Sequence, residues 1–447
     1  MRNKEKGITL IALIITIIVM LILVGVVVTV VIQSNLLGTA KTAGDKYKTA
    51  YEDESNMSEV TINGEKYASI EDYIESTKPL PEIKAGERAS ETSKYQTAVI
   101  PKGFTVSNAT GEKDVSTGLV IYDIPENEIE NIKWDGTEKT QYNQFVWIPV
   151  EVNKTTEPKD TETSIASFKR SVWQDNARVA NNAQSSTSFP SSSYSWSNYT
   201  EPYSKDSSDY DGTGTGKTGI SAQITELTQS IYKYGGFYIG RYEAGSETER
   251  TNSSGVTTLG IKQDMYPYIY VKWGDSMGNI GTTGAVYLSN SLYTGKTGYG
   301  VKSMLCTGAA WDSMLDFIKD SSHNVTSSPS WGNYKYSDTY KVYRGSLYSN
   351  STWSVADTTN GSDVTKDTSI LLTTGATERN SSKNIYDVAG NCYEWTTEAR
   401  NASYRVFRGG NYFYDGSSFP ASYRDGSCGP TFSYNGCSFR PLLYVAL

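Results

Sequence analysis

The residues best suited to contact another molecule lie near the end of the chain, between Asn411 and Ser438. This stretch is rich in Tyr, Phe, Ser, Asp, Gly and Cys, and it has no Lys, Glu, Gln, Met, Leu, Ile or Val. Tyr and Phe offer large contact area for little lost rotamer freedom, while Ser, Gly and Asn adapt their hydrogen bonds, as in antibody loops. The composition therefore predicts a binding surface.

Residue types that carry most enzyme and metal chemistry are scarce. The 447-residue chain has one histidine, His323, in a Ser-rich stretch that favours a solvated loop side chain. Its cysteines, Cys306, Cys392, Cys428 and Cys437, follow none of the usual zinc or redox spacings. A net charge of -8 and a pI of about 5.1 give no basic footprint for nucleic acid. We therefore expect no nucleic-acid partner.

The N-terminus predicts where the binding surface is displayed. A basic leader, residues 1–7, precedes an uncharged apolar run over residues 8–32. At about 1.5 Å per helical residue, this run is long enough to span the roughly 30 Å hydrocarbon core of a bilayer. Basic residues favour the cytoplasmic side, so the rest of the chain is expected outside the cell. The predicted location is the cell membrane, with one span and an extracellular C-terminal domain.

The same junction, "KGITLIALIITIIVMLILVGVV", resembles the N-terminal methylation motif of type IV prepilins. The resemblance implies a prepilin peptidase as partner and cleavage between Gly7 and Ile8. It departs from the family at Ala12, where pilins usually carry the Glu that pairs with a neighbour's amine during assembly. An uncleaved signal anchor is the alternative reading.

The body of the chain reads as one large α+β domain. Residues 33–97 are polar and then rich in Pro, Ser and charge, which predicts a stalk with weak helical spacing and a linker. Residues 98–447 follow as the domain, with strand-like runs at 118–124 and 143–152. A Ser-, Tyr- and Gly-rich stretch near 182–217 lacks apolar periodicity and is expected to be a surface insertion or disordered loop.

Two amphipathic core helices are predicted within this domain. In "ISAQITELTQSIYKYGG" the apolar residues recur at helical spacing and Gly235 supplies the C-terminal stop. In "LCTGAAWDSMLDFIKD" Thr307 is a plausible N-cap, and Trp311, Met314 and Leu315 belong to one apolar face.

Four ordered segments together resemble the formylglycine-generating enzyme (sulfatase-modifying factor) family. They are "GGFYIGRYEAG", "NIYDVAGNCYEWTTEAR", "RVFRGGNYFY" and a closing "SFRP", and the helix "LCTGAAWDSML" also matches a family pattern. The resemblance covers most of residues 235–441 and implies a C-type lectin-like fold. It also implies a calcium ion held by the side chains of Asp387 and Glu394 and the carbonyls of Gly390 and Cys392, as suits a hard cation. The alternative is that Asp387 and Glu394 only cap turns and pair with arginines.

The catalytic feature of that family is missing here. Its members hold copper with a cysteine pair placed between the "RGG" motif and the next Arg, and here that interval is "NYFYDGSSFPASY". Without a thiolate there is neither a nucleophile nor a soft metal ligand. We expect no catalytic residues and no copper.

The replacement sequence has its own pattern. Pro420, Ala421, Arg424 and Pro430 stand as framework residues among Tyr, Phe, Asp, Gly, Ser, Asn and Cys, all of which arise from an Asn codon by changing its adenines. On this fold, residues 411–438 resemble the variable region of the variable proteins of diversity-generating retroelements. The predicted ligand contacts are Tyr412, Phe413, Tyr414, Asp415, Phe419, Tyr423, Asp425, Phe432, Tyr434 and Asn435. An ordinary aromatic-rich segment, part core and part loop, is the alternative.

Together these features predict a membrane-anchored or pilin-like surface display protein that binds an external protein or glycan. A formylglycine-generating-type oxidase and a structural pseudopilin are the rival functions.

Overall fold

The computed structural model describes residues 60–62, 65–67, 98–124, 126–152, 168–178, 219–275, 280–401 and 403–447. The chain divides into two units, Met1–Lys78 and Pro79–Leu447. The leader 1–7, the apolar run 8–32 with its Gly7–Ile8 junction, and the polar stretch 182–217 lie outside the described residues. Within the described ranges, no helix has the length and apolar character needed to cross a bilayer.

In the first unit the structure shows a β-hairpin. Strands β1 (Val60–Ile62) and β2 (Glu65–Tyr67) pair antiparallel, with Val60 opposite Tyr67. The sequence between them, Asn63-Gly64, is the type that most favours a two-residue hairpin turn. The stalk was expected to continue with weak helical spacing, and at this point that expectation is wrong because the turn signal and the β-branched residues dominate locally. Outside this hairpin, residues 33–97 are not described.

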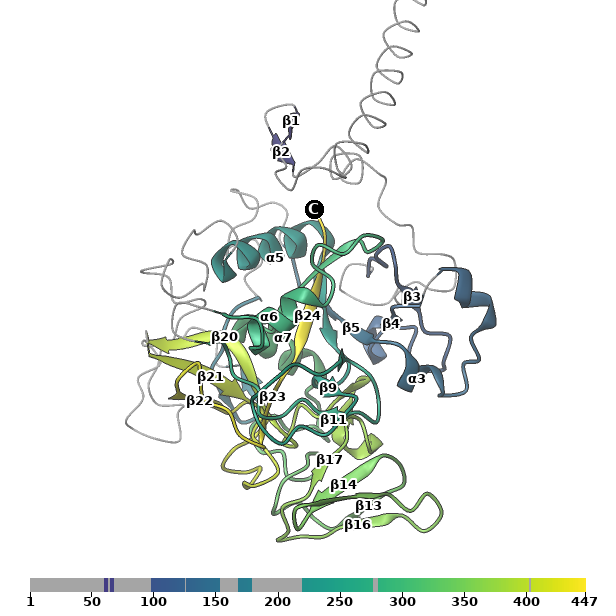
Figure 1. Ribbon diagram of the computed structural model, residues 1–447, viewed down its shortest axis with the longest axis vertical. Helices are drawn as coiled ribbons and strands as arrows, with labels where there is room; N and C mark the ends of the chain where they lie inside the picture. The colour runs from purple at the N-terminus through teal and green to yellow at the C-terminus, as the bar shows by residue number, and fades with distance from the viewer. Residues whose placement is uncertain are drawn as a thin grey trace, which may run out of the picture. The chain divides into compact units, whose positions relative to one another are not determined.

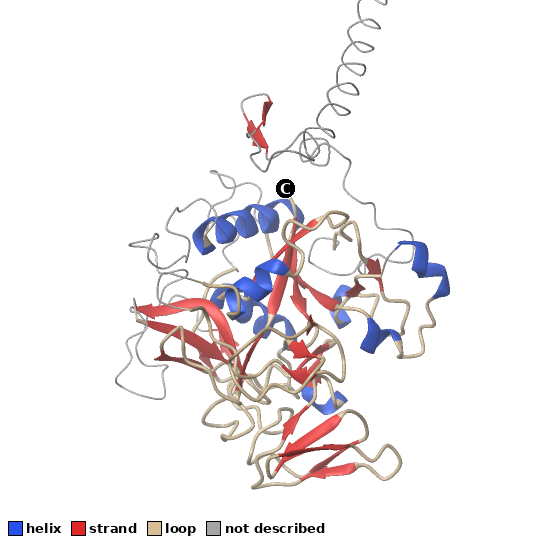
Figure 2. Ribbon diagram, in the orientation of Figure 1, coloured by secondary structure: helices blue, strands red, loops and turns tan. Residues whose placement is uncertain are grey.

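The second unit is built on a six-stranded antiparallel sheet (Figures 1 and 2). Its strands, in spatial order, are β12 (Val301–Leu305), β24 (Pro441–Val445), β8 (Gly236–Gly240), β5 (Gln144–Pro149), β4 (Val120–Tyr122) and β3 (Thr105–Val106). The predicted strand-like runs at 118–124 and 143–152 contain β4 and β5, so both predictions are confirmed. The last strand of the chain lies inside this sheet.

Both faces of the six-stranded sheet are buried. Along β8, Tyr238 points into one apolar cluster while Phe237 and Ile239 point into another, as the two-residue period of a strand requires. Helix α6 (Ala285–Ser291) belongs to the first cluster and α7 (Gly308–Ile318) to the second, while α5 (Ile220–Tyr234) contributes its two ends to the first and its middle to the second.

The two predicted helices are confirmed, including their ends. Helix α5 stops at Gly235, which adopts φ 79° and donates its N–H to Ile231 O. Helix α7 begins after Thr307, whose side chain accepts a hydrogen bond from the N–H of Ala310. The apolar face of α7 is buried.

A second, four-stranded sheet carries the C-terminal region of interest. Its spatial order is β22 (Arg424–Cys428), β21 (Tyr404–Arg408), β20 (Tyr393–Asn401) and β23 (Cys437–Phe439). The chain leaves β21 and runs through residues 411–438, which include β22. It then returns as β23, which pairs in parallel with β20. Helix α7 contacts both β20 of this sheet and β5 of the larger one.

Smaller elements complete the described chain. The short strands are β6 (Trp173–Gln174), β7 (Ala177–Arg178), β9 (Gly245–Ser246), β10 (Leu259–Gly260), β11 (Tyr266–Pro267), β13 (Tyr340–Val342), β14 (Ser346–Ser349), β15 (Thr352–Val355), β16 (Ser362–Val364), β17 (Leu371–Leu372), β18 (Ser381–Ser382) and β19 (Ile385–Tyr386). The short helices are α3 (Glu138–Gln141) and the 3-10 turns Val115–Thr117, Glu126–Asn131 and Glu378–Asn380. The described chain is thus a mixed α and β structure with many strands and few helices.

Candidate functional site

Two buried carboxylates fix the strands that flank residues 411–438. Arg408, at the end of β21, donates to Asp312 Oδ1 at 2.6 Å, and Arg424, at the start of β22, donates to Asp312 Oδ2 at 2.7 Å. Arg424 Nε also lies 2.7 Å from Glu398 Oε1 on β20. All four side chains are buried, and the partly exposed Arg170 also lies 3.4 Å from Glu398 Oε1, so each carboxylate is paired with more than one guanidinium. Residue 424 is therefore a structural anchor.

The electrostatics of this cluster are set by the arginines. Burial alone would raise the pKa of Asp312, but the Arg408 and Arg424 guanidiniums outweigh that effect and lower it to about 2. The indole N–H of Trp173 and the backbone N–H of Ser171 also donate to this carboxylate, at 2.9 and 2.7 Å. Asp312 is consequently ionised throughout the physiological range.

The chain enters the segment through a glycine turn. Gly409 and Gly410 have φ of 92° and 72°, and a Cβ on Gly410 would lie 2.1 Å from the carbonyl oxygen of Phe419. Only glycine adopts this backbone at such close approach. The "RGG" motif thus packs the start of the segment against its own middle.

Asn411 then ties the start of the segment to its end. Its side-chain amide donates to the Tyr434 hydroxyl and, at 3.2 Å, to the carbonyl of Gly436, while its Oδ1 accepts from the N–H of Phe413 at 3.0 Å. Asn411 is fully buried. A buried amide with its bonds satisfied fixes the loop in one conformation.

Two buried rings on the four-stranded sheet form a floor beneath the segment. Tyr393 of β20 and Phe407 of β21 stack with their centroids 5.6 Å apart. Tyr414 and Tyr423 pack on Tyr393 at 5.9 and 6.2 Å, and Phe432 packs on Phe407 at 6.0 Å. The segment's rings therefore lie on a rigid aromatic base.

The rings of the segment also contact one another. Phe419 lies between Tyr414, at 4.6 Å, and Tyr423, at 4.8 Å, and Phe432 lies 5.3 Å from Tyr434. Tyr414 and Phe432 are each 41% exposed. The remaining predicted contact residues that are partly exposed are Phe413, Asp415, Phe419, Tyr423, Asp425, Tyr434 and Asn435.

Tyr412 is the exception among the predicted contacts. It is 2% exposed and packs in a cluster with Ile269, Leu371 and Cys392, and its N–H donates to Asn391 O at 3.0 Å. Its hydroxyl is buried without a partner. In this conformation Tyr412 supports Phe413, 4.0 Å away, rather than offering a surface of its own.

The four framework residues are buried. Ala421 donates its N–H to Ser328 Oγ at 3.0 Å, and its carbonyl accepts from the Trp311 indole at 3.1 Å. Pro420, Arg424 and Pro430 are also buried, and the Pro430 carbonyl accepts from Gly274 N–H at 3.1 Å. The framework residues are therefore buried and the predicted contact residues are partly exposed, except for Tyr412, which is as buried as the framework residues.

The two predicted calcium-binding carboxylates already have hydrogen-bond partners. Glu394 is buried, and Arg440 donates to both of its oxygens, Nε at 2.9 Å. Asp387 Oδ2 accepts from the N–H of Gly375 at 2.7 Å. Glu394 thus follows the alternative reading, pairing with arginine.

One further carboxylate stands beside this group. Glu243 accepts from Asn391 and lies beside the Cys392 thiol, and Asp387 Oδ1 is buried with no hydrogen-bond partner among the described residues. Burial raises the pKa of Asp387 to about 7. The described residues contain no set of three or more His, Cys, Asp or Glu side chains placed to hold a metal ion. With Glu394 committed to Arg440, the predicted donor set does not fit calcium as arranged, and calcium stays a prediction.

The cysteines are free thiols with little nucleophilic character. Cys306, Cys392 and Cys437 are buried and Cys428 is partly exposed. Burial raises the pKa of Cys428 to about 11, so it is a neutral thiol at physiological pH.

Other aromatic residues beside the segment were not among the predicted ligand contacts. Tyr270, Tyr348 and Trp353 pack against the cluster that contains Tyr412. They come from separate stretches that share no period or motif, so only the tertiary structure brings them together. An alternating strand pattern around Trp353 was the one local signal.

The chain has little similarity to known proteins. No protein-family model matches the chain, and no curated protein matches it. Among solved structures it is similar to Treponema denticola variable protein 1, with 14% identity, a TM-score of 0.25, and coverage of 46% of this chain and 84% of that chain. A TM-score at this level supports no argument about fold or function.

Proposed function

We propose that this protein binds an external ligand through residues 411–438 and that these residues are diversified. The observation that carries the proposal is the division within the segment. The residues expected to be fixed, Pro420, Ala421, Arg424 and Pro430, are buried, whereas the expected contacts other than Tyr412 keep part of their side chains in solvent. A surface that must change without unfolding the domain needs this division.

The aromatic floor adds a second reason. Rings such as Tyr414 and Phe432 are costly to leave exposed unless they meet a partner. Tyr and Phe held on a rigid base lose little further entropy when a ligand binds. The ligand class is a protein or a glycan, and no catalytic step is proposed because the segment offers no thiolate.

The motifs in residues 235–441 support a C-type lectin-like fold for the domain, and the sequence of residues 1–32 supports display from a cell membrane. Processing by a prepilin peptidase between Gly7 and Ile8 belongs to the same proposal. N-terminal sequencing of the mature protein tests it, since an intact Met1 would contradict cleavage.

Sequencing the gene's surroundings tests diversification. The proposal predicts a reverse-transcriptase gene nearby and a second, imperfect copy of the coding sequence for residues 411–438 that differs from it at adenines. The absence of both would contradict diversification and leave a binder of fixed sequence.

A further inference from the structure

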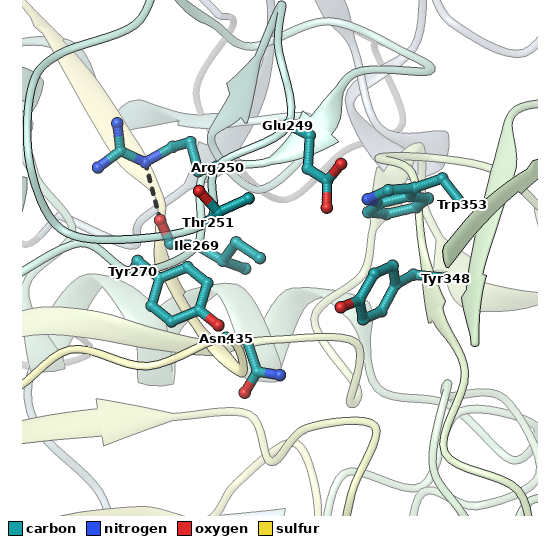
Figure 3. Close-up of a pocket in the computed structure, with 8 residues that line it drawn as sticks. All are labelled: Glu249, Arg250, Thr251, Ile269, Tyr270, Tyr348, Trp353 and Asn435. Atoms are coloured by element: carbon teal, nitrogen blue, oxygen red, sulfur yellow. Dashed lines mark hydrogen bonds between the residues drawn. The ribbon is translucent and has the colours of Figure 1, made fainter. Parts of the chain in front are cut away.

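A small cavity opens beside the segment, on elements that are not part of it. Its volume is about 80 Å³, and it is lined by Glu249, Arg250, Thr251, Ile269, Tyr270, Tyr348, Trp353 and Asn435 (Figure 3). Asn435 is the one lining residue that belongs to residues 411–438. The other lining residues lie outside the segment that we propose is diversified, so they are expected to stay constant.

Two of the rings are held by a tight hairpin. Tyr348 of β14 and Trp353 of β15 are directly paired across the strands, and their ring centroids lie 5.3 Å apart. The turn residues Asn350 and Ser351 both have positive φ, 49° and 65°, as a two-residue hairpin turn with matching strand twist requires. Tyr266 packs edge-on against the other side of Trp353 at 5.0 Å. The ring pair is therefore preorganised.

Tyr270 forms the opposite wall in a strained conformation. Its φ is 55°, which is rare for an aromatic residue, and its N–H donates to the carbonyl of Tyr434 at 3.0 Å. Strain of this kind is unfavourable and persists only where the surroundings enforce it, often at ligand sites. Tyr270 thus links this cavity to the end of the segment.

The two charged residues of the lining differ in their partners. Glu249 is exposed, none of the described residues forms a hydrogen bond or ion pair with its side chain, and its carboxylate lies on the side of Tyr348 and Trp353 (Figure 3). The neighbouring cation, Arg250, is occupied: it donates to Ile269 O at 2.8 Å and stacks on Tyr268 at 4.2 Å. In Figure 3 its guanidinium points away from the two rings. The lining thus holds one carboxylate and one guanidinium, but the guanidinium is engaged elsewhere, so the Glu249 carboxylate is left to pair with a cation of the ligand.

We infer that this cavity binds a cationic group, an alkylammonium or guanidinium, between Tyr270 and the Tyr348–Trp353 pair with Glu249 as its counter-ion. Aromatic faces carry negative potential and attract such cations, most strongly when a Trp takes part. The cation is a Lys or Arg side chain of a protein ligand or a small amine.

This inference deepens the proposed function, because it gives the external ligand one chemical feature that does not depend on the diversified residues. It rests on that function only in assuming that this face meets a ligand.

Titration of the full-length chain in a non-ionic detergent tests the inference. The probes are choline, N-acetyl-lysine methylamide and N-acetyl-arginine methylamide at constant ionic strength, followed by saturation-transfer NMR. The neutral isostere 3,3-dimethylbutanol and a methyl glycoside serve as controls. We expect millimolar binding of at least one cation and at least tenfold weaker binding of the neutral probes. Choline alone binding indicates a small amine, and the amino-acid probes binding indicates a protein side chain.

Variants locate the site. Glu249→Gln is expected to weaken cation binding about tenfold, because it removes the counter-ion at an exposed position. Glu247→Gln, an equally exposed acid two residues away that does not line the cavity, is expected to leave it unchanged. Trp353→Leu is expected to abolish binding and Trp353→Phe to retain part of it.

Equal binding of choline and dimethylbutanol, binding of the glycoside alone, or equal effects of the two glutamine variants would overturn the inference. None of these outcomes bears on diversification, which the gene's surroundings decide separately. Absence of a template repeat would in turn leave the cation site standing.

Discussion

Residues 411–438 and the strands beneath them use different chemistry for different purposes. Asp312, Glu398, Arg408 and Arg424 form a buried cluster of ion pairs that joins β22, within the segment, to β20, β21 and α7. Elsewhere in the segment, Tyr414 and Phe432 keep 41% of their surface in solvent and make no ion pair in the described structure. The comparison teaches that the residues that hold the strands together are buried, whereas the residues that we propose bind the ligand are partly exposed and can change at little cost to the fold.

The largest expected effect comes from breaking the buried cluster. Asp312→Asn leaves two buried guanidiniums facing one carboxylate, and we expect the free energy of unfolding to fall by about 3–5 kcal/mol. Urea unfolding followed by tryptophan fluorescence measures it. The matched control is Asp425→Asn, a partly exposed acid on β22, for which we expect a loss below about 1 kcal/mol. Equal losses would contradict the division between framework and surface.

A smaller loss is expected from the glycine turn. Gly410→Ala places a Cβ 2.1 Å from a backbone oxygen at a φ of 72°, so we expect a cost of about 2–3 kcal/mol. Gly429→Ala, in the same segment, meets its nearest atom at 3.5 Å without such a φ and should cost less than about 1 kcal/mol. Thermal unfolding of both variants checks the contrast, and a stable Gly410→Ala protein would show that the entry turn is not fixed.

Acid should remove the advantage of the buried cluster. The pKa of Asp312 is lowered in the fold to about 2, below the unfolded value of about 3.9, so its contribution is complete above the unfolded value. That contribution, about 2 kcal/mol by linkage, is lost as the pH falls through about 2. The stability difference between the wild type and Asp312→Asn should therefore narrow from pH 5 to pH 2. A constant difference would mean that Asp312 is not ionised in the fold.

The smallest effects are expected on the surface itself. Tyr414→Asn and Phe432→Asn each remove a ring that is already 41% exposed, so we expect stability losses of about 1 kcal/mol or less. Phe407→Ala, beneath them, is the contrast, with about 3–5 kcal/mol. Chemical unfolding of the three variants checks this order, and a large loss at Tyr414 would identify it as core.

The sequence predicted the local parts of this arrangement well. The Thr307 cap of α7, the Gly235 stop of α5 and the strands β4 and β5 each depend on residues a few positions apart, which sequence patterns report directly. The clustering of aromatic and small polar residues after the "RGG" motif likewise marked the segment that lies on the floor formed by Tyr393 and Phe407.

Features that depend on pairing between distant strands were not predictable. The parallel register of β20 with β23 puts Glu394 opposite Ser438, two residues from Arg440, and this contact turns a predicted cation ligand into an ion-pair partner. Tyr412 looked like its neighbours in sequence, but it follows the anchored Asn411 and is drawn into the cluster around Ile269 and Leu371. The cavity lined by Glu249 and Trp353 has no sequence signature beyond the alternating strand pattern around Trp353, because its walls come from separate stretches of the chain.

The most direct test of the central claim is to sequence many natural copies of this gene and map the substitutions onto the structure. The account predicts that they concentrate in the codons of partly exposed positions such as Tyr414, Phe432 and Asn435, at nucleotides where the proposed template copy has adenine. Asn411, Pro420, Ala421, Arg424 and Pro430 should stay unchanged, as should the cavity wall at Tyr348 and Trp353. Substitutions spread evenly over buried and exposed positions, or absent from residues 411–438, would contradict it.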